Sequence, residues 1–224
     1  MRYGLAALCG SVMMISQMAQ AGVVVGATRL VYEGDKKESS LSVNNPDALP
    51  YLIQSWVEPQ EGSNEKAPFI LTPPLFRLDG GRQNVLRVVR VGGSLPEDRE
   101  SLYWLNVKSI PSAERLDNTL QIAIKTRIKL IYRPASLKGL PETVTGQLTW
   151  HRKGTQLEVS NPTPFYMNFQ NVTVNGHEVK DATYVAPHGS ASFSLPAGAG
   201  NAVTWRLIND FGGPGALQRG ALQG

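Results

Sequence analysis

Histidine and cysteine are the residue types in this chain that most often serve catalysis or bind metals. His151, His177 and His188 lie in or beside predicted turns, and none has a second histidine or a carboxylate at ligand spacing. Cys9 is the single cysteine, so the chain can form neither an internal disulfide nor a thiolate zinc site. A nucleophile elbow, a zinc-protease helix motif and a P-loop are also missing from the sequence. We therefore predict that the protein is not an enzyme and uses no metal and no other cofactor.

The segment Leu120 to Tyr132 has the most informative pattern. Its even-numbered positions are aliphatic except for Thr126: Leu120, Ile122, Ile124, Ile128 and Leu130. Its polar residues at odd numbers are Gln121, Lys125, Arg127 and Lys129. This alternation predicts a strand with one face on a core. At roughly 3.3 Å per residue the strand would span about 43 Å, whereas ordinary strands have about six residues. Its length therefore exceeds what one sandwich requires.

A second unusual feature is Arg29, which shares its parity with the apolar residues Val25, Ala27 and Val31. A cation in an apolar row indicates either a cleft edge or a bulge that turns the side chain outward. A surface arginine that extends its charged end into water is an equally good interpretation. The sequence does not choose between them.

The elements that must position these residues are predicted to be strands. Short apolar runs alternate with turn formers, among them 22 Gly and 15 Pro. In the first part of the chain the predicted strands are Val23 to Tyr32, Ser39 to Asn44, Tyr51 to Glu58, Phe69 to Thr72, Asn84 to Val91, Leu102 to Lys108 and Thr119 to Tyr132. Seven short strands in about 110 residues are typical of an immunoglobulin-like sandwich. The stretch from Arg133-Pro134 to Pro141-Glu142 is the predicted linker.

The same pattern resumes after the linker. The predicted strands are Gly146 to His151, Thr155 to Ser160, Phe165 to Asn171, Val172 to Asn175, Ser190 to Leu195 and Val203 to Asn209. Asn175-Gly176 predicts a two-residue hairpin turn, because both of its central positions favour positive φ. We expect the tail from Gly212 onward to be frayed. The fold class is therefore all-β, with two β-sandwich domains at 22–142 and 143–224.

The N-terminus predicts a secretory signal peptide at 1–21. Met1-Arg2 precedes an apolar run from Leu5 to Ile15, and Ala19-Gln20-Ala21 provides a cleavage site with small residues. The run is about half as long as a bilayer-spanning helix, so we expect a protein that does not span a membrane. A mature chain without cysteine suits an oxidising compartment.

The formal net charge of +4 does not predict binding to nucleic acid. Basic and acidic residues are interspersed, as in Asp35-Lys36-Lys37-Glu38, which is typical of a solvated surface. Secretion also argues against a nucleic acid partner.

Seven blocks, in order and at similar spacing, resemble the periplasmic chaperones of the chaperone-usher pilus pathway. They are Gly26 to Tyr32, Tyr51 to Trp56, Thr72 to Arg77, Asp98 to Trp104, Ile128 to Pro134, Asn161 to Tyr166 and Ile208 to Gly212. The resemblance spans nearly the whole mature chain. It implies two immunoglobulin-like domains in a boomerang arrangement, a periplasmic location, and pilus (fimbrial) subunits and an outer-membrane usher as partners.

The resemblance also implies roles for single residues. Arg29 and Lys129 match a cation pair that binds the C-terminal carboxylate of a pilus subunit. Leu120, Ile122 and Ile124 match the donor residues that fill the open groove of a subunit. Glu100, Arg133 and Asp210 match a buried interdomain ionic cluster. The short segment Pro111 to Thr119 and the absence of a cysteine pair resemble the short-loop branch of the family.

Two other functions remain open at this stage. A structural fibre subunit or adhesin of the same pathway would be one incomplete sandwich with its own donor extension, whereas this chain contains strands for two sandwiches. A secreted β-sandwich hydrolase would need a catalytic cluster, which the sequence does not provide.

Overall fold

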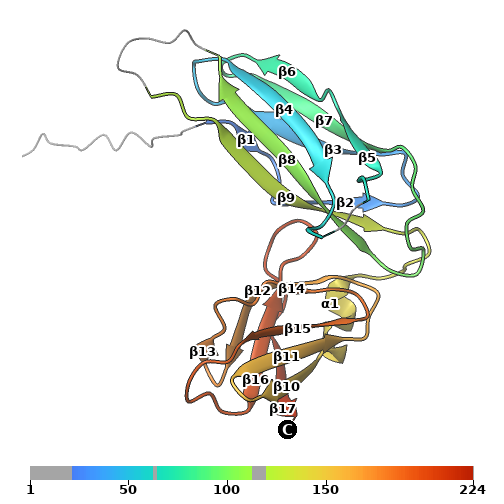
Figure 1. Ribbon diagram of the computed structural model, residues 1–224, viewed down its shortest axis with the longest axis vertical. Helices are drawn as coiled ribbons and strands as arrows, with labels where there is room; N and C mark the ends of the chain where they lie inside the picture. The colour runs from blue at the N-terminus through green and yellow to red at the C-terminus, as the bar shows by residue number, and fades with distance from the viewer. Residues whose placement is uncertain (1–21, 63–64, 113–119, 224) are drawn as a thin grey trace, which may run out of the picture.

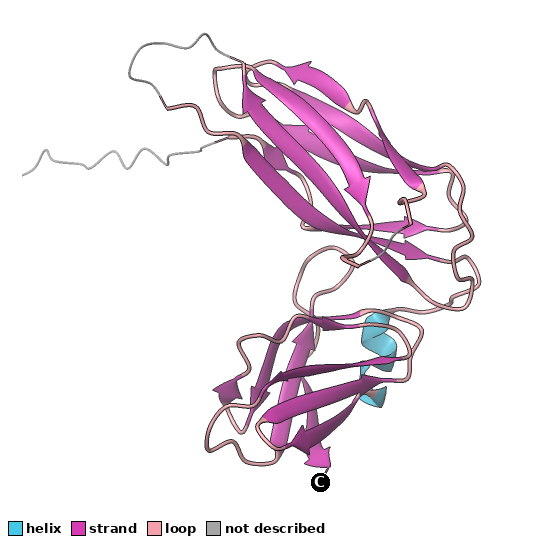
Figure 2. Ribbon diagram, viewed as in Figure 1, coloured by secondary structure: helices cyan, strands magenta, loops and turns pink. Residues whose placement is uncertain are grey.

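The computed structural model describes residues 22–62, 65–112 and 120–223. They form two β-sandwich domains of the immunoglobulin-like type, which meet at an angle and give the chain a boomerang shape (Figure 1). Strands dominate both domains, and the helical residues lie in the C-terminal one (Figure 2). The predicted signal peptide at 1–21 and the predicted start of the long strand at Thr119 lie outside the described residues.

The N-terminal domain consists of two facing sheets. One has the strand order β1-β3-β7-β5 and contains β1 (Val24–Val25), β3 (Glu38–Asn44), β7 (Gln83–Arg90) and β5 (Phe69–Thr72). The other has the order β2-β9-β8-β4-β6 and contains β2 (Arg29–Glu33), β9 (Ile124–Arg133), β8 (Ser101–Pro111), β4 (Tyr51–Glu58) and β6 (Leu75–Leu78). Alternate residues of these strands point inward and form one apolar core. Strand β6, which follows a cis Thr72–Pro73 bond, was missing from the sequence prediction.

The opening strand is divided between the two sheets, although the sequence predicted one strand from Val23 to Tyr32. Strand β1 pairs with β3, whereas β2 pairs with β9 in the other sheet. The chain crosses between the sheets beside Gly26, whose N–H donates to the carbonyl of Ser42 at 2.9 Å. A Cβ atom at residue 26 would lie 2.0 Å from the Ser42 hydroxyl oxygen, so this crossing requires glycine. As a result, Arg29 becomes the first residue of β2.

The long strand is shorter than predicted, because β9 begins at Ile124 instead of Thr119. Its antiparallel pairing with β8 ends at the pair Ser109 and Ile124, close to the end of β8 at Pro111. Residues 120–123 precede β9 and are not assigned to a strand.

The C-terminal domain is a curled sheet with the strand order β13-β12-β16-β17-β10-β11-β15, and β14 pairs with β12. Its elements are α1 (Pro141–Val144), the 3₁₀ turn η1 (Thr145–Gln147), β10 (Thr149–Lys153), β11 (Gln156–Asn161), β12 (Met167–Val174), β13 (His177–Glu178), β14 (Tyr184–Val185), β15 (Gly189–Ser194), β16 (Ala202–Leu207) and β17 (Gln218–Gln223). The predicted hairpin at Asn175-Gly176 is confirmed, since these residues have φ angles of 52° and 85° between β12 and β13.

Two strands of this domain differ from the sequence prediction. The two strands expected on either side of residue 171 are one strand, β12, which a bulge between Phe169 and Asn171 keeps continuous. The strand expected from Gly146 begins at Thr149, since Pro141 starts a helical turn and the Trp205 indole N–H holds Thr145 at 2.8 Å.

The tail prediction was wrong, because residues after Gly212 are not frayed. Strand β17 pairs antiparallel with β16 and parallel with β10, so it joins the two layers of the domain. Leu222 packs against the core, and Gly220 lies against the ring of Trp205, where a Cβ atom would be only 3.2 Å from a ring carbon. Pairing with the edges of β10 and β16 makes this segment a strand, although its own composition does not predict one.

We expect a chain that ends at Leu217, and therefore lacks β17, to melt at a lower temperature. Its β10 and β16 would lose their shared hydrogen-bond partner, and Leu222 would leave the core. Thermal unfolding followed by near-UV circular dichroism measures the change, and a chain that lacks only Gly224 is the control. Equal melting temperatures for all three chains would show that β17 adds no stability.

Candidate functional site

Strands β2 and β9 place Arg29 and Lys129 side by side, although the two residues are a hundred positions apart in the sequence. The strands run parallel, and their register pairs Arg29 with Lys129. Ile128 and Leu130 on either side of Lys129 are buried in the N-terminal core. Because successive side chains point to opposite faces, Lys129 faces the C-terminal domain.

Arg29 is buried between the two domains, with 7% of its surface exposed. Its Nη1 donates to the backbone carbonyl of Ile208 in the C-terminal domain at 3.2 Å. Its buried Nε has no hydrogen-bond partner among the described residues. Burial lowers the pKa of Arg29, and the charges of Asp210 and Glu142 oppose this shift. The structure therefore excludes the interpretation of Arg29 as a surface arginine that extends into water.

Lys129 reaches the C-terminal domain as well. Its Nζ donates to Oδ1 of Asn168 on β12 and lies 4.3 Å from the ring centre of Tyr184 on β14. Burial and, second, the charge of Arg29 lower the pKa of Lys129 to about 8. Two cations therefore share one partly dry space between the domains, where a negative group would relieve their repulsion.

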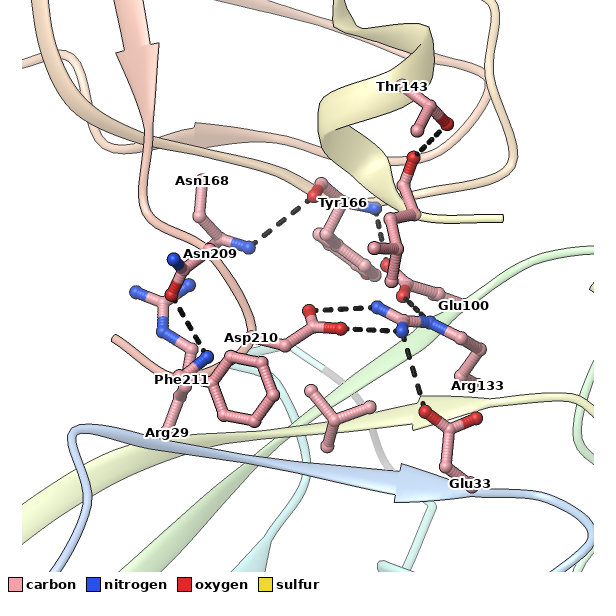
Figure 3. Close-up of polar contacts among 12 residues, drawn as sticks. Arg29, Glu33, Glu100, Arg133, Thr143, Tyr166, Asn168, Asn209, Asp210 and Phe211 are labelled. Carbon is pink, nitrogen blue, oxygen red and sulfur yellow. Dashed lines mark hydrogen bonds and ion pairs between the residues drawn. The ribbon is translucent and has the colours of Figure 1, made fainter. Parts of the chain in front are cut away.

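Glu100, Arg133 and Asp210 also lie together at the domain junction (Figure 3). Arg133 on β9 donates from Nε to Glu100 at 2.8 Å, and from Nη1 and Nη2 to the two carboxylate oxygens of Asp210 at 2.7 and 3.0 Å. The other oxygen of Glu100 accepts from the backbone N–H of Tyr166 at 2.7 Å. The cluster therefore joins β9 and the residue before β8 in the first domain to two segments of the second.

The charges of this cluster are buried. Burial raises the pKa of Glu100 to about 7, although Arg133 and the Tyr166 N–H favour its charged form. Burial also acts to lower the pKa of Arg133, but the hydrogen bonds to Asp210 and the charge of Glu100 outweigh it, so this pKa is raised. Two carboxylates thus keep the guanidinium charged, and its planar donors fix the orientation of both.

Sequence reasoning missed several residues of this junction. Glu33 lies opposite Arg133 in the β2–β9 register and approaches its Nη1 at 3.5 Å. Tyr166 packs with Leu102 and Ile131 in an apolar cluster between the domains, and Asn168 and Tyr184 hold Lys129. Glu33 had a detectable signal, since it follows Arg29 by four residues on the same strand face. No sequence signal predicted the contacts that Asn168 on β12 and Tyr184 on β14 make with Lys129.

The predicted donor residues extend away from the core along the even-numbered face of the chain. Leu130 is fully buried and Ile128 is 6% exposed, whereas Ile124, Ile122 and Leu120 are 43%, 61% and 84% exposed. One aliphatic row therefore begins inside the N-terminal domain and ends in solvent. The structure does not bring these three residues close to the cation pair, since Ile124 is the first residue of β9 and the other two precede it, whereas Lys129 lies in the second half of the strand.

Comparison with known proteins places both domains in one family. Residues 22–138 match the family of pili and flagellar-assembly chaperones, PapD N-terminal domain, and residues 143–218 match the pili assembly chaperone PapD, C-terminal domain. The chain belongs to the PapD family of pilus-assembly chaperones.

Individual relatives in this family cover nearly the whole chain. The probable fimbrial chaperone LpfB of Escherichia coli O157:H7 is 46% identical over 212 residues, which are 92% of this chain and 91% of LpfB. The SafB chaperone, solved with the SafA pilin of Salmonella enterica, has a TM-score of 0.85 and 41% identity over 90% of this chain and 96% of its own. The periplasmic chaperone SfaE has a TM-score of 0.77 and 40% identity over 90% of this chain and 100% of its own.

Within residues 22–62, 65–112 and 120–223, no group of three histidine, cysteine or acidic residues has the geometry to hold a metal ion. In the same residues, no helix is long and apolar enough to cross a membrane.

Replacing Arg133 with alanine should destabilise the chaperone by about 3 to 5 kcal/mol, because Glu100 and Asp210 would stay in the junction without their cation. The midpoint of urea unfolding measures this loss. Arg77→Ala is a matched control, since Arg77 pairs with Asp79 at 2.7 Å but both side chains are about 60% exposed. We expect less than about 1 kcal/mol from the control. Similar losses for the two variants would contradict a structural role for the buried cluster.

Proposed function

We propose that this protein is a periplasmic chaperone that binds, folds and caps pilus subunits by donor-strand complementation and delivers them to an outer-membrane usher. One observation carries the proposal: an aliphatic row leaves the core and becomes exposed before β9, and the same strand carries a cation directed into the domain junction. The SafB chaperone, which was solved with a pilin, supports this assignment.

The physical basis is the addition of a strand to an incomplete sheet. A subunit that lacks one strand exposes core side chains and two unpaired strand edges, which is an aggregation hazard. Leu120, Ile122 and Ile124 can fill such a groove, and their burial contributes up to about 5 to 9 kcal/mol at roughly 1.5 to 3 kcal/mol each. A hydrogen bond to a charged group contributes about 1.5 to 3 kcal/mol. The apolar term therefore dominates the affinity.

The cation pair then determines the register. In our proposal, Arg29 and Lys129 bind the C-terminal carboxylate of the subunit. Lys129 lies five residues from Ile124, which corresponds to about 17 Å of extended chain. A carboxylate bound at Lys129 therefore aligns the groove of the subunit with the aliphatic row. A slip by one residue would turn that row away from the groove.

The organisation of the chain follows from the same proposal. Residues 1–21 are a signal peptide that is removed during export, 22–142 are the N-terminal domain, and 143–224 are the C-terminal domain. The family matches, which start at residues 22 and 143, support these bounds. The protein acts by binding and not by catalysis, and the short segment Pro111 to Thr119 assigns it to the short-loop branch. A fibre subunit is disfavoured, because the chain contains two sandwiches.

Purification of the tagged chaperone from a periplasmic extract, followed by mass spectrometry, tests the function. We expect a pilin to co-purify, and recovery of the chaperone without any pilin from cells that assemble pili would contradict the proposal.

Ile122→Arg should abolish the capture of this pilin but leave the chaperone folded, because Ile122 lies outside the core and 61% of its surface is exposed. Co-purification and circular dichroism measure the two effects. Val85→Arg is the control, since Val85 is an exposed aliphatic residue of β7 on the other sheet. If Ile122→Arg unfolded the chaperone, residues 120–124 would be ordinary core.

Lys129→Ala should weaken binding of a peptide with the C-terminal sequence of the co-purified pilin, and the same peptide with an amidated C-terminus should already bind weakly to the wild type. The two losses of affinity should not add, because the substitution and the amidation remove the same contact between Lys129 and the carboxylate. Binding of the free acid should fall as the pH rises through about 8, where Lys129 loses its proton. Isothermal titration measures all three effects. Equal affinity of acid and amide for the wild type would contradict the anchor.

The structure makes Lys129 a cleaner test than Arg29. Loss of the Arg29 side chain would also leave the carbonyl of Ile208 without its donor and loosen the domain junction.

A further inference from the structure

The two cations of the cleft make their direct hydrogen bonds to neutral oxygen atoms. Lys129 donates to the side-chain amide oxygen of Asn168, and Arg29 donates to the backbone carbonyl of Ile208. Both acceptors belong to the C-terminal domain. Hydrogen bonds to an ionised acceptor are about twice as strong as those to a neutral one. These two contacts are therefore weaker than the contacts that an incoming carboxylate can offer.

Carboxylates are present at the junction but do not pair with these cations. Both oxygens of Asp210 bind Arg133, and Glu100 binds Arg133 and the N–H of Tyr166. Glu142 influences Arg29 through space, but its buried Oε2 has no hydrogen-bond partner among the described residues. None of the salt bridges in the described parts of the chain involves Arg29 or Lys129.

Asn168 is held rigidly where it meets Lys129. Its side chain is buried, and its backbone pairs with Tyr184, whose ring lies beside the same ammonium. Its backbone carbonyl accepts from the N–H of Ile208 at 2.8 Å. One hydrogen-bonded unit of the C-terminal domain therefore carries both neutral acceptors, the amide of Asn168 and the carbonyl of Ile208.

We propose that Asn168 is a positioning residue, whose neutral amide oxygen holds the ammonium of Lys129 in the cleft until a subunit carboxylate displaces it. This inference rests on the proposed function. A neutral acceptor at this position keeps Lys129 directed into the cleft, yet it leaves the positive charge uncompensated for the ligand. An aspartate at residue 168 would instead neutralise Lys129 permanently and compete with the subunit.

The surroundings of Lys129 define the expected pH behaviour. The charged and titratable groups that face it are Arg29 on β2 and Tyr184 on β14, while Asp210 and Glu142 act on Arg29. On β8, the residue opposite Lys129 is Trp104, which does not titrate. A new carboxylate at residue 168 would therefore be the only negative group in contact with Lys129 within the described parts of the chain.

The test uses the full mature chain with two variants, Asn168→Asp, which keeps the shape of the side chain, and Asn168→Ala, which removes the acceptor. NMR titration of the Lys129 Cε resonance, assigned with Lys129→Arg, gives its pKa in each protein. Sodium acetate and acetamide at constant ionic strength serve as charged and neutral probes of the anchor. Circular dichroism verifies that each variant is folded.

We expect Asn168→Asp to raise the pKa of Lys129 by about one to three pH units, which is the usual effect of an adjacent opposite charge. Its affinity for acetate should fall about tenfold or more at both pH 6 and pH 7. Asn168→Ala should lower the pKa of Lys129. The affinity of this variant for acetate should therefore be restored at pH 6, where Lys129 is charged. A loss of folding would not produce these opposite pH profiles.

Several results would overturn the inference. An unchanged pKa of Lys129 in Asn168→Asp would show that Asn168 does not position Lys129. So would an affinity of Asn168→Asp for acetate equal to that of a wild type that binds acetate. If Asn168→Asp did not fold, an unchanged pKa in Asn168→Ala would have the same meaning. If the wild type responded equally to acetate and acetamide, both the proposed carboxylate anchor and this inference would be wrong. Capture of a pilin from the periplasm would still decide the chaperone function separately.

Discussion

The parallel pairing of β2 with β9 is the constraint on which the rest of this molecule depends. It places Arg29 opposite Lys129 at one end of the pair and Glu33 opposite Arg133 at the other. Lys129, Ile131 and Arg133 have the same parity, so all three face the C-terminal domain. They make, in turn, the contact to Asn168, the apolar contact to Tyr166 and the ion pair with Asp210. One face of β9 thus carries three of the contacts that join the two domains.

The opposite face of β9 belongs to the N-terminal core at one end and to solvent at the other. Leu130 and Ile128 are buried, while Ile122 and Leu120 are exposed because β8 ends and leaves them without a neighbouring strand. Continuity of the strand therefore links the folded core to the exposed row. The buried end therefore holds the exposed end of this row at a fixed number of residues from Lys129.

The electrostatics of the junction divide into two parts. Arg133 is surrounded by carboxylates, so its charge is compensated within the chain. Arg29 and Lys129 meet neutral oxygens and repel each other. Burial and, second, this repulsion lower the pKa of Lys129. Four positions along β9 therefore separate Arg133, which is paired with carboxylates, from Lys129, which contacts the neutral amide of Asn168.

The sequence by itself determined the strand content, the two sandwiches, the hairpin at Asn175-Gly176 and the aliphatic row from Leu120 to Leu130. These features depend on the period of hydrophobic residues and on the φ preferences of single residues, which are local properties. The sequence also predicted Arg29 and Lys129 together, but only through the resemblance to a family. Tertiary structure alone decided that Arg29 is buried, that β9 starts at Ile124, and that residues 218–223 form β17. It also decided that Asn168 holds Lys129. Each of these depends on which distant backbone edge or polar atom comes close in the folded chain, and no local pattern encodes that choice.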